Sequence, residues 1–423
     1  MTVNFYTLTL VLVFLVTIDF RIEISQVLPS ATILEISAYI IALLYIGQYG
    51  LRTDTNTIKD KIISFITNNK IACLYFFWTA LAAVVGLIKS TETLQVFKDL
   101  LPSLILLFFV VTFIYNEKRI RALITVYVVG IFFNIILATL QIMTNKYYIG
   151  GISEITFLKT NPQGDIVDHI AMGFYAHPNG FAMFLIPGII LIVSMLRFRY
   201  VKTVRFKIVL LMILPIIFFV LLHTYAKGAM AWTILGLLLL ICAPYIGQKW
   251  RFTTGILINI GGIIFLSLYS IWLFFTSNSA FGTMLGRMSL WIAGVVTLSR
   301  DYFIMAFGNG YVNMRHTSLD LFNIDYDNAH NGFINQALNY GLPALLLFLV
   351  LIIATFKELA SSPDGPHGKM KAIKIFCFSA LVAVFGNYFF EPAELGVSAQ
   401  AHIFLLLAIA SIISKPFKQL THD

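Results

Sequence analysis

The chain has 423 residues, of which 59% are hydrophobic and only 12% are charged, and its mean hydropathy is +0.87. A water-soluble globule cannot bury so much apolar surface, so the composition excludes one and predicts a polytopic membrane protein. The net charge of +9 is compatible with nucleic-acid binding. Basic residues that orient a membrane protein are the stronger interpretation, so we expect no nucleic-acid partner.

Apolar segments long enough to cross a bilayer recur along the chain. Lipid offers no hydrogen-bond partner to a bare backbone amide, so each span is expected to be a helix of ~20 mostly apolar residues. The first segment is interpreted as a span, because no small-residue cleavage site of a signal peptide precedes "DFRIEIS". The sequence predicts an all-α protein, one polytopic domain over 1–423, with about twelve transmembrane helices: 4–20, 31–50, 71–88, 98–115, 123–143, 179–196, 208–224, 229–247, 254–276, 334–356, 375–390 and 396–414.

The basic residues predict the orientation of these spans. Cytoplasmic loops carry an excess of Lys and Arg, and an even number of spans puts both termini on one side. We therefore expect both termini in the cytoplasm and the longest outer loops at about 144–178 and 277–333. On this topology 20 of the 29 Lys and Arg residues lie in the inner segments 52–70, 116–122, 197–207, 248–253, 357–374 and the tail after 414.

The sequence carries no cofactor or metal motif. Cys73, Cys242 and Cys377 lie inside predicted spans without metal-ligand spacing, and are expected to pack as small apolar residues. A P-loop, a Rossmann glycine motif, HExxH and CxxC do not occur. We therefore expect no nucleotide-driven, redox or zinc chemistry, and no cofactor.

The outer segment 277–333 interleaves aromatic and aliphatic residues, which is not typical of a disordered loop. In "RMSLWIAGVV", helical spacing brings Leu290, Trp291, Val295 and Val296 within one or two turns of Arg287. This pattern predicts a half-buried helix at the membrane surface. Arg287 at its start would contact either lipid headgroups or the phosphates of a substrate.

Three cations lie in the outer polar segments nearest to His330. Lys227 follows Tyr225 in the tight turn "HTYAKGAMAW", Arg287 opens the predicted surface helix, and Arg315 lies in "NMRH". If Lys227, Arg287 and Arg315 face one cavity, they would bind a pyrophosphate, because a guanidinium holds phosphate oxygens bidentately and an ammonium acts as a point charge.

The stretch "DNAHNGFINQALNYGLP" places His330 directly ahead of an apolar helix. An imidazole with an ordinary pKa of about 6.5 can take a proton from a hydroxyl if a neighbour fixes its tautomer. Asp325, Asp327 and Asn328 are the candidates for that neighbour. In the alternative interpretation Asp327, Asn328 or Asn331 caps the helix and His330 is merely solvated.

Other polar residues at outer helix ends have two interpretations. His177 in "AHPNG" either bonds substrate or marks a helix start. His223 is expected to satisfy a helix end. Glu391 and Glu394 in "FFEPAELG" are expected to form a solvated turn between the last two spans.

The run His330-Asn331, nine residues and then Gly341-Leu342-Pro343-Ala344 resembles the signature of the O-antigen ligases and their polymerase relatives. A short outer turn with a basic residue, then "GRMSLW" and "FGNGY" precede it, in the order found in that family. The resemblance covers about 225–350 closely, within a catalytic region of about 208–356, and the twelve-span layout in general.

The resemblance implies a GT-C-like membrane glycosyltransferase whose long periplasmic loop carries short amphipathic helices. It would act at the periplasmic face of the bacterial inner membrane, moving a glycan from undecaprenyl pyrophosphate to an acceptor sugar or glycolipid without metal. Arg287 would hold the donor pyrophosphate and His330 would activate the acceptor hydroxyl. Lys227 stands where the family usually has Arg, which puts bidentate phosphate binding there in doubt. The other expected substrate contacts are Arg315, Asn331, Asp327, Tyr225 and His177.

Two further functions stay open. A polysaccharide polymerase would use the same donor and residues but pass the glycan to another lipid-linked repeat unit. A transporter or flippase often has twelve spans, but it usually carries ionisable residues near the membrane midplane. Here the predicted spans are nearly free of charge and the polar residues gather at one face, so we favour a transferase of the ligase type.

Overall fold

The computed structural model gives a bundle of helices. The residues that it describes are 4–18, 21–22, 31–50, 55–88, 92–144, 158–160, 166–175, 177–198, 200–201, 203–276, 284–308, 310–326, 328–361, 368–391 and 397–414. Strands in these ranges form only two small antiparallel hairpins, β1 (Arg21–Ile22) with β2 (Ala31–Thr32) and β3 (Leu158–Thr160) with β4 (Ile166–His169).

The helices follow the predicted segments closely. Each of the twelve predicted spans overlaps one apolar helix, and three further helices, α11, α12 and α13, fill most of the predicted outer segment 277–333. In chain order the helices are α1 (Phe5–Val16), α2 (Ile33–Gly50), α3 (Thr55–Asn68), α4 (Lys70–Gly86), α5 (Glu92–Phe113), α6 (Glu117–Thr144), α7 (Pro178–Arg197), α8 (Val204–Leu222), α9 (Lys227–Cys242), α10 (Gln248–Thr276), α11 (Met284–Arg300), α12 (Tyr302–Phe307), α13 (Gly310–Phe322), α14 (Gly332–Ser361), α15 (Gly368–Tyr388) and α16 (Val397–Ser414).

The length and composition of the helices make the chain a multi-pass membrane protein. In the described ranges, eight helices are long and apolar enough to cross a bilayer: α5, α6, α7, α8, α10, α14, α15 and α16. The bent pair α3 and α4 would be a ninth, and α1, α2 and α9 are shorter apolar helices. The number of twelve spans therefore stays a prediction.

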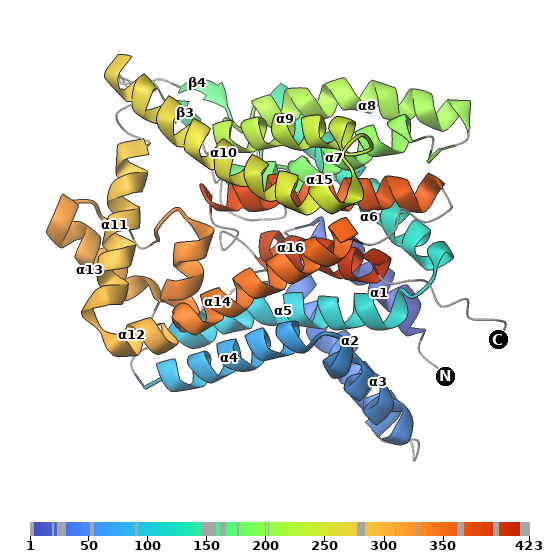
Figure 1. Ribbon diagram of the computed structural model, residues 1–423, viewed down its shortest axis with the longest axis horizontal. Coiled ribbons are helices and arrows are strands. Elements are labelled where there is room, and N and C mark those ends of the chain that lie inside the picture. Colours follow the sequence, from blue (N-terminus) through green and yellow to red (C-terminus); the bar gives the residue numbers. More distant parts are fainter. Residues whose placement is uncertain are drawn as a thin grey trace.

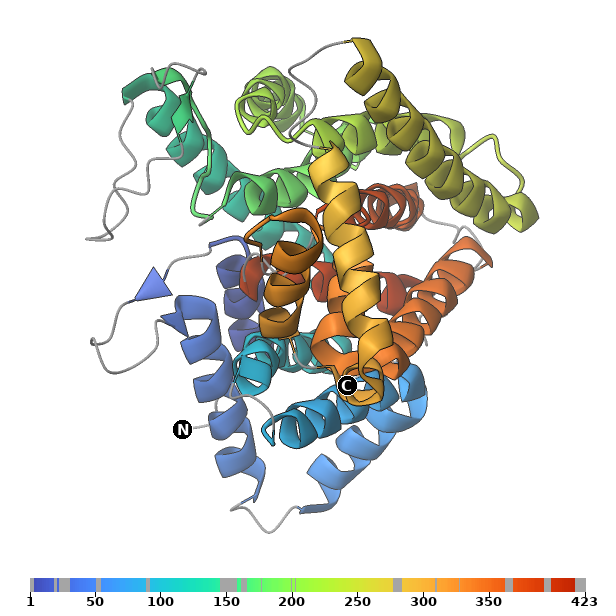
Figure 2. The same ribbon diagram turned by 90° about the vertical axis from the view of Figure 1, so that its left-hand side faces the viewer.

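The long helices lie side by side, and α11, α12 and α13 stack across one end of them (Figure 1). Figure 2 looks onto this end and shows α11 lying across the ends of the long helices. We call the end covered by α11, α12 and α13 the capped end, and the opposite one the basic end.

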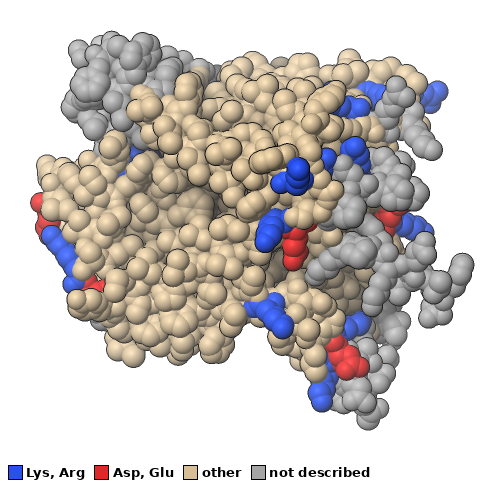
Figure 3. Space-filling model, in the orientation of Figure 1, with Lys and Arg blue, Asp and Glu red and all other residues tan. Residues whose placement is uncertain are grey.

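The basic end collects the helix termini that carry Lys and Arg. Gln248 at the start of α10 bonds the carbonyl of Ser361 at the end of α14, and Arg197 at the end of α7 bonds the carbonyl of Ile241 in α9 at 3.4 Å. Figure 3 shows Lys and Arg gathered on this side of the molecule. The asymmetry agrees with the expected charge bias. The basic residues of these termini include Lys59, Lys61, Lys70, Lys118, Arg119, Arg121, Arg197, Arg205, Lys207, Lys249, Arg251, Lys357 and Lys371.

Two separate cores hold the molecule together. The main core fills the bundle from α1 to α16. A smaller core joins α11, α12 and α13 to the first turns of α14, through buried side chains such as Leu290, Met314 and Leu338. The cap is therefore built around its own apolar centre.

Gly341 bends α14 just beyond the smaller core. Its φ is +84°, and a Cβ atom there would lie 2.0 Å from the carbonyl oxygen of Ala306 in α12. Only glycine fits this left-handed conformation against a passing backbone. Pro343, two residues later, has no backbone N–H to donate to a helix hydrogen bond.

Gly341→Ala is expected to destabilise the fold by about 2–4 kcal/mol, because it adds both backbone strain and a clash with backbone atoms. Thermal unfolding in detergent measures the loss. Gly261→Ala is the matched control, since a Cβ at Gly261 in α10 meets nothing within 4 Å. Equal unfolding temperatures for the two variants would contradict the role given to Gly341.

Candidate active site

His330 lies at the capped end, in the turn that leads into α14. Its φ is +46°, a conformation rarely adopted by a non-glycine residue and one that is often found at functional sites. The side-chain oxygen of Asn328 accepts a hydrogen bond from the His330 backbone N–H at 3.0 Å. His330 keeps only 15% of its side chain exposed, so the alternative of a merely solvated histidine is wrong.

Asn331 is the cap of α14. Its side-chain oxygen accepts hydrogen bonds from the backbone N–H groups of Phe333 and Ile334, at 3.0 and 3.1 Å. This is the geometry expected of an N-cap asparagine. The side-chain oxygen of Asn331 therefore holds the helix start, and a substrate contact of this residue stays a prediction.

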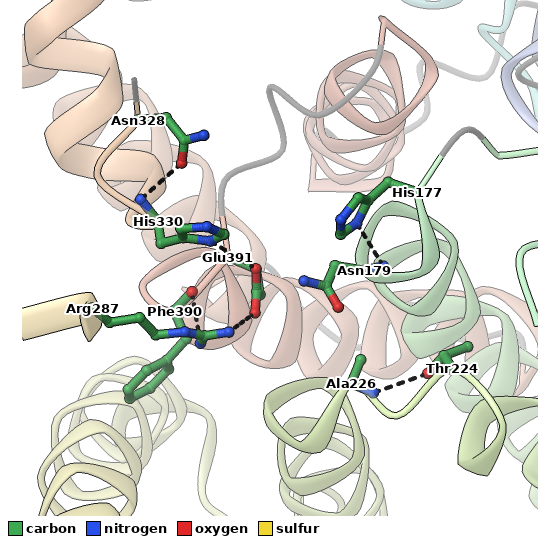
Figure 4. Close-up of polar contacts among 9 residues, drawn as sticks. All are labelled: His177, Asn179, Thr224, Ala226, Arg287, Asn328, His330, Phe390 and Glu391. Atoms are coloured by element: carbon green, nitrogen blue, oxygen red, sulfur yellow. Dashed lines mark hydrogen bonds and ion pairs between the residues drawn. The ribbon is translucent and has the colours of Figure 1, made fainter. Parts of the chain in front are cut away.

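Glu391 joins Arg287 and His330. Arg287 Nη1 donates to the carbonyl of Phe390 at 3.0 Å and Nη2 donates to Glu391 Oε1, while His330 Nδ1 lies 3.5 Å from Glu391 Oε2. In Figure 4, Arg287 and His330 reach Glu391 from one side, and His177 and Asn179 lie on the other. Two side chains from distant parts of the chain thus contact the same carboxylate.

The expectation of a solvated turn at Glu391 is wrong, since only 7% of its side chain is exposed. Aromatic packing explains the burial. Phe389, two residues earlier, stacks edge-on against Trp291 of α11, with ring centroids 5.1 Å apart. This contact packs α11 over the turn, so that Glu391 is buried beneath α11. Glu394, the other acid of the turn, lies outside the described residues.

The charges around Glu391 keep it ionised. Burial on its own would raise the pKa of this carboxyl, but the contact with His330 and the positive charge of Arg287 outweigh burial, and the pKa lies below its ordinary value. The carboxylate faces His330 Nδ1, which favours the tautomer with the proton on Nδ1. A distance of 3.5 Å exceeds that of a normal hydrogen bond, so this contact is mainly electrostatic.

The residues expected to fix the His330 tautomer have other partners. Asp325 forms an ion pair with Arg315, with 2.7 Å between Arg315 Nη2 and Asp325 Oδ2, and Asn328 bonds the backbone. Asp327 lies outside the described residues. In the described part of the chain, Glu391 is the carboxylate at the ring.

The structure does not bring Arg315 to this cluster. Arg315 lies on α13 with 58% of its side chain exposed, and it forms an ion pair with Asp325. The hydrogen bond from Arg315 lowers the pKa of Asp325. A common cavity for all three predicted cations is therefore not supported, because this ion pair satisfies Arg315 on the surface of the cap.

His177 marks the start of a helix, as one of its two interpretations expected, and its substrate contact stays a prediction. It caps α7, since its Nδ1 accepts a hydrogen bond from the backbone N–H of Asn179 at 3.1 Å. Burial is the largest cause that lowers the pKa of His177. The charge of Glu391 opposes this effect and that of His330 adds to it. A neutral ring is consistent with an accepting Nδ1, and the start of α7 faces the cluster (Figure 4).

The start of α9 also faces the cluster. Lys227, its first residue, is exposed, and the helix begins without a side-chain cap. Tyr225 just before it has a φ of +55°, a second strained position. A Cβ at Gly228 would lie 3.3 Å from the side-chain oxygen of Asn387, which is four residues before Glu391. The first turn of α9 thus packs directly on the end of α15.

Asn387 is fully buried, at 0% exposure, and no described residue bonds either its oxygen or its nitrogen. Sequence reasoning missed Asn387 and the burial of Glu391. The signal available was a polar residue and an acid in the otherwise apolar run "NYFFEP", Asn387 to Pro392. Among the described residues no group of three or more His, Cys, Asp or Glu could hold a metal ion.

The end of α15 is therefore the common wall of a polar site. It presents an ionised carboxylate to a guanidinium and an imidazole, and a buried amide to the start of a helix. A comparison of the chain with protein-family models and with curated proteins finds no match in either.

Proposed function

We propose that this chain is a membrane glycosyltransferase of the O-antigen ligase type, which moves a glycan from undecaprenyl pyrophosphate to an acceptor hydroxyl. The meeting of Arg287, His330 and Glu391 at the capped end carries the proposal. This reaction needs charge neutralisation on the leaving pyrophosphate and a base for the nucleophile. The cluster offers a candidate for each.

The donor pyrophosphate would bind between Arg287 and the start of α9. Helix N-termini carry a partial positive charge and free N–H groups, and α9 begins without a side-chain cap. Lys227 in its first turn adds a full charge at the same place. This charge does not depend on the bidentate geometry that an arginine would supply.

The acceptor hydroxyl would give its proton to His330. With Nδ1 facing Glu391, the other ring nitrogen, Nε2, is the base. As the hydroxyl oxygen bonds to the anomeric carbon of the donor sugar, the bond from this carbon to the pyrophosphate oxygen breaks. Undecaprenyl pyrophosphate leaves, and Glu391 stabilises the imidazolium that forms. Glu391 is thus a positioning residue that acts through His330.

The distribution of charge supports a location in the bacterial inner membrane. The basic end would face the cytoplasm with both termini, and the capped end, with the active site, would face the periplasm. The single polytopic domain would then have a GT-C-like arrangement, with α11, α12 and α13 as the amphipathic helices of its periplasmic segment.

Reconstitution in lipid vesicles tests the proposal. The purified chain is mixed with an undecaprenyl-pyrophosphate-linked repeat unit and a glycolipid acceptor, without nucleotide or ion gradient. We expect glycan to appear on the acceptor. Growth of the lipid-linked chains instead would indicate the polymerase alternative. Movement of the donor across the membrane without transfer would reject the proposal in favour of a flippase.

A further inference from the structure

A cavity of about 300 Å³ lies at the basic end, far from the cluster around Glu391. It is an open pocket lined by the junction of α3 with α4 and by α5, α14 and α16. Leu107, Leu351 and Leu407 contribute to its apolar wall, and Lys70 and Glu358 carry its charges. The cavity therefore combines an apolar wall with one cationic and one anionic side chain.

Lys70 and Glu358 have no partner within the described part of the chain. Neither of them forms an ion pair or a side-chain hydrogen bond with another described residue, and both are exposed. Lys70 and Glu358 line the same cavity. Two opposite charges that do not meet each other are available to a ligand that carries both signs.

The helix ends strengthen the same pattern of charge. Lys70 is the first residue of α4, and Asn69 before it makes no side-chain capping bond. Glu358 lies near the end of α14, three residues before its last residue, Ser361. The partial charge of a helix is positive at its start and negative at its end, so each dipole adds to the side chain beside it. One part of the cavity therefore attracts a phosphate and the other an ammonium group.

α3 indicates the depth of the cavity in the membrane. It is bent by 99° from α4, so it lies across the direction of that apolar helix. Ile62, Ile63 and Ile66 are exposed along one side of it together with Lys59, whose long side chain can reach the headgroups, whereas Asp60 and Ser64 lie on the other side. Such an amphipathic helix lies in the membrane interface. The cavity at its junction with α4 is then level with the lipid headgroups.

We propose that this cavity binds a zwitterionic phospholipid with a primary ammonium headgroup. The phosphate lies at Lys70 and the start of α4, the ammonium donates to the carboxylate of Glu358, and an acyl chain runs along Leu107 and Leu351. The site is independent of the proposed transferase activity, since it lies at the opposite end of the bundle. The bound lipid would contact α3, α4 and α14 together and so stabilise their packing.

Native mass spectrometry of the full chain in detergent tests this site. The protein is incubated in turn with phosphatidylethanolamine, phosphatidylcholine and phosphatidylglycerol that carry the same acyl chains. We expect roughly tenfold stronger retention of phosphatidylethanolamine, since choline has no N–H to donate and glycerol carries no positive charge. Equal retention of the three lipids would overturn the proposal.

Variants assign the two charges. Glu358→Gln is expected to bring the retention of phosphatidylethanolamine and phosphatidylcholine to within about twofold of each other, because the ammonium loses a charged partner. Lys70→Gln is expected to weaken both. Lys357→Gln is the control, because Lys357 is exposed on the same turn but does not line the cavity. A preference that survives Glu358→Gln, or a retention that Lys70→Gln leaves unchanged, would reject the assignment.

Soluble phosphoethanolamine separates a lipid from a free headgroup. The apolar wall predicts that this compound alone does not compete with phosphatidylethanolamine at equal concentration. Competition that depends on Lys70 and Glu358 would overturn the assignment of a lipid. Thermal unfolding without added lipid checks that each variant folds, and both exposed substitutions are expected to leave the unfolding temperature unchanged.

Discussion

Replacing His330 by alanine is expected to reduce glycan transfer by about 10²- to 10⁴-fold, the usual contribution of a general base. Donor binding should change little, because in the proposed mechanism His330 acts on the acceptor hydroxyl. Initial rates in vesicles and donor binding measured separately check the two expectations. Glu391 keeps its ion pair with Arg287 in this variant, so the fold should persist.

His316→Ala is the matched control, since His316 is an exposed histidine on the same cap. It should leave transfer within about twofold of the wild type, as surface substitutions usually do. If His330→Ala kept wild-type turnover, the assignment of the base would be wrong. Glu391→Gln separates position from charge, because glutamine keeps the shape and an acceptor oxygen but loses the charge that stabilises the imidazolium.

Arg287→Ala is expected to have two effects, one on stability and one on the donor. It leaves Glu391 buried without its guanidinium partner, which should cost about 3 kcal/mol, the low end for a broken buried pair because Arg287 remains 25% exposed. It also removes the guanidinium from the proposed pyrophosphate site, which should weaken donor binding by about tenfold to a hundredfold. Unfolding temperature and donor affinity at neutral pH measure these two effects.

The double variant Arg287→Ala with Glu391→Gln distinguishes the two effects. Neutralising the orphaned carboxylate should recover much of the stability, but it cannot recover the lost phosphate contact. Arg287→Lys should restore binding only in part, because an ammonium cannot bond the Phe390 carbonyl, the carboxylate and a phosphate in the same planar geometry. Donor affinity that rises together with stability in the double variant would mean that Arg287 has a structural role alone.

The apolar helices could be predicted from the sequence because each span satisfies its own backbone and so leaves a local signal. The start of α11 near Arg287 was predicted correctly, and Leu290 is buried there as expected. The predicted buried face was partly wrong, since Val295 is 56% exposed. The spacing of four apolar residues does not show which of two neighbouring helix faces packs against the bundle when both faces are apolar.

The pairing at the site could not be predicted in the same way. Asp325 and Asn328 are near His330 in the chain, and local reasoning chose them. The actual carboxylate is 61 residues away from His330 and 104 residues away from Arg287. Its burial depends on the packing of Trp291 against Phe389, which no local pattern encodes. Contacts of this kind follow from the fold as a whole.

The two cores meet at the carboxylate. Ala329, beside His330, belongs to the smaller core, whereas Phe390, beside Glu391, belongs to the main one. The ion pair between Arg287 and Glu391 thus connects the two cores at their boundary. A molecule that contacts both cores stabilises the boundary between them and slows amide hydrogen exchange in α11 to α13. A molecule that only displaces the carboxylate weakens this boundary. Occupancy of the site is therefore tied to how often the cap opens.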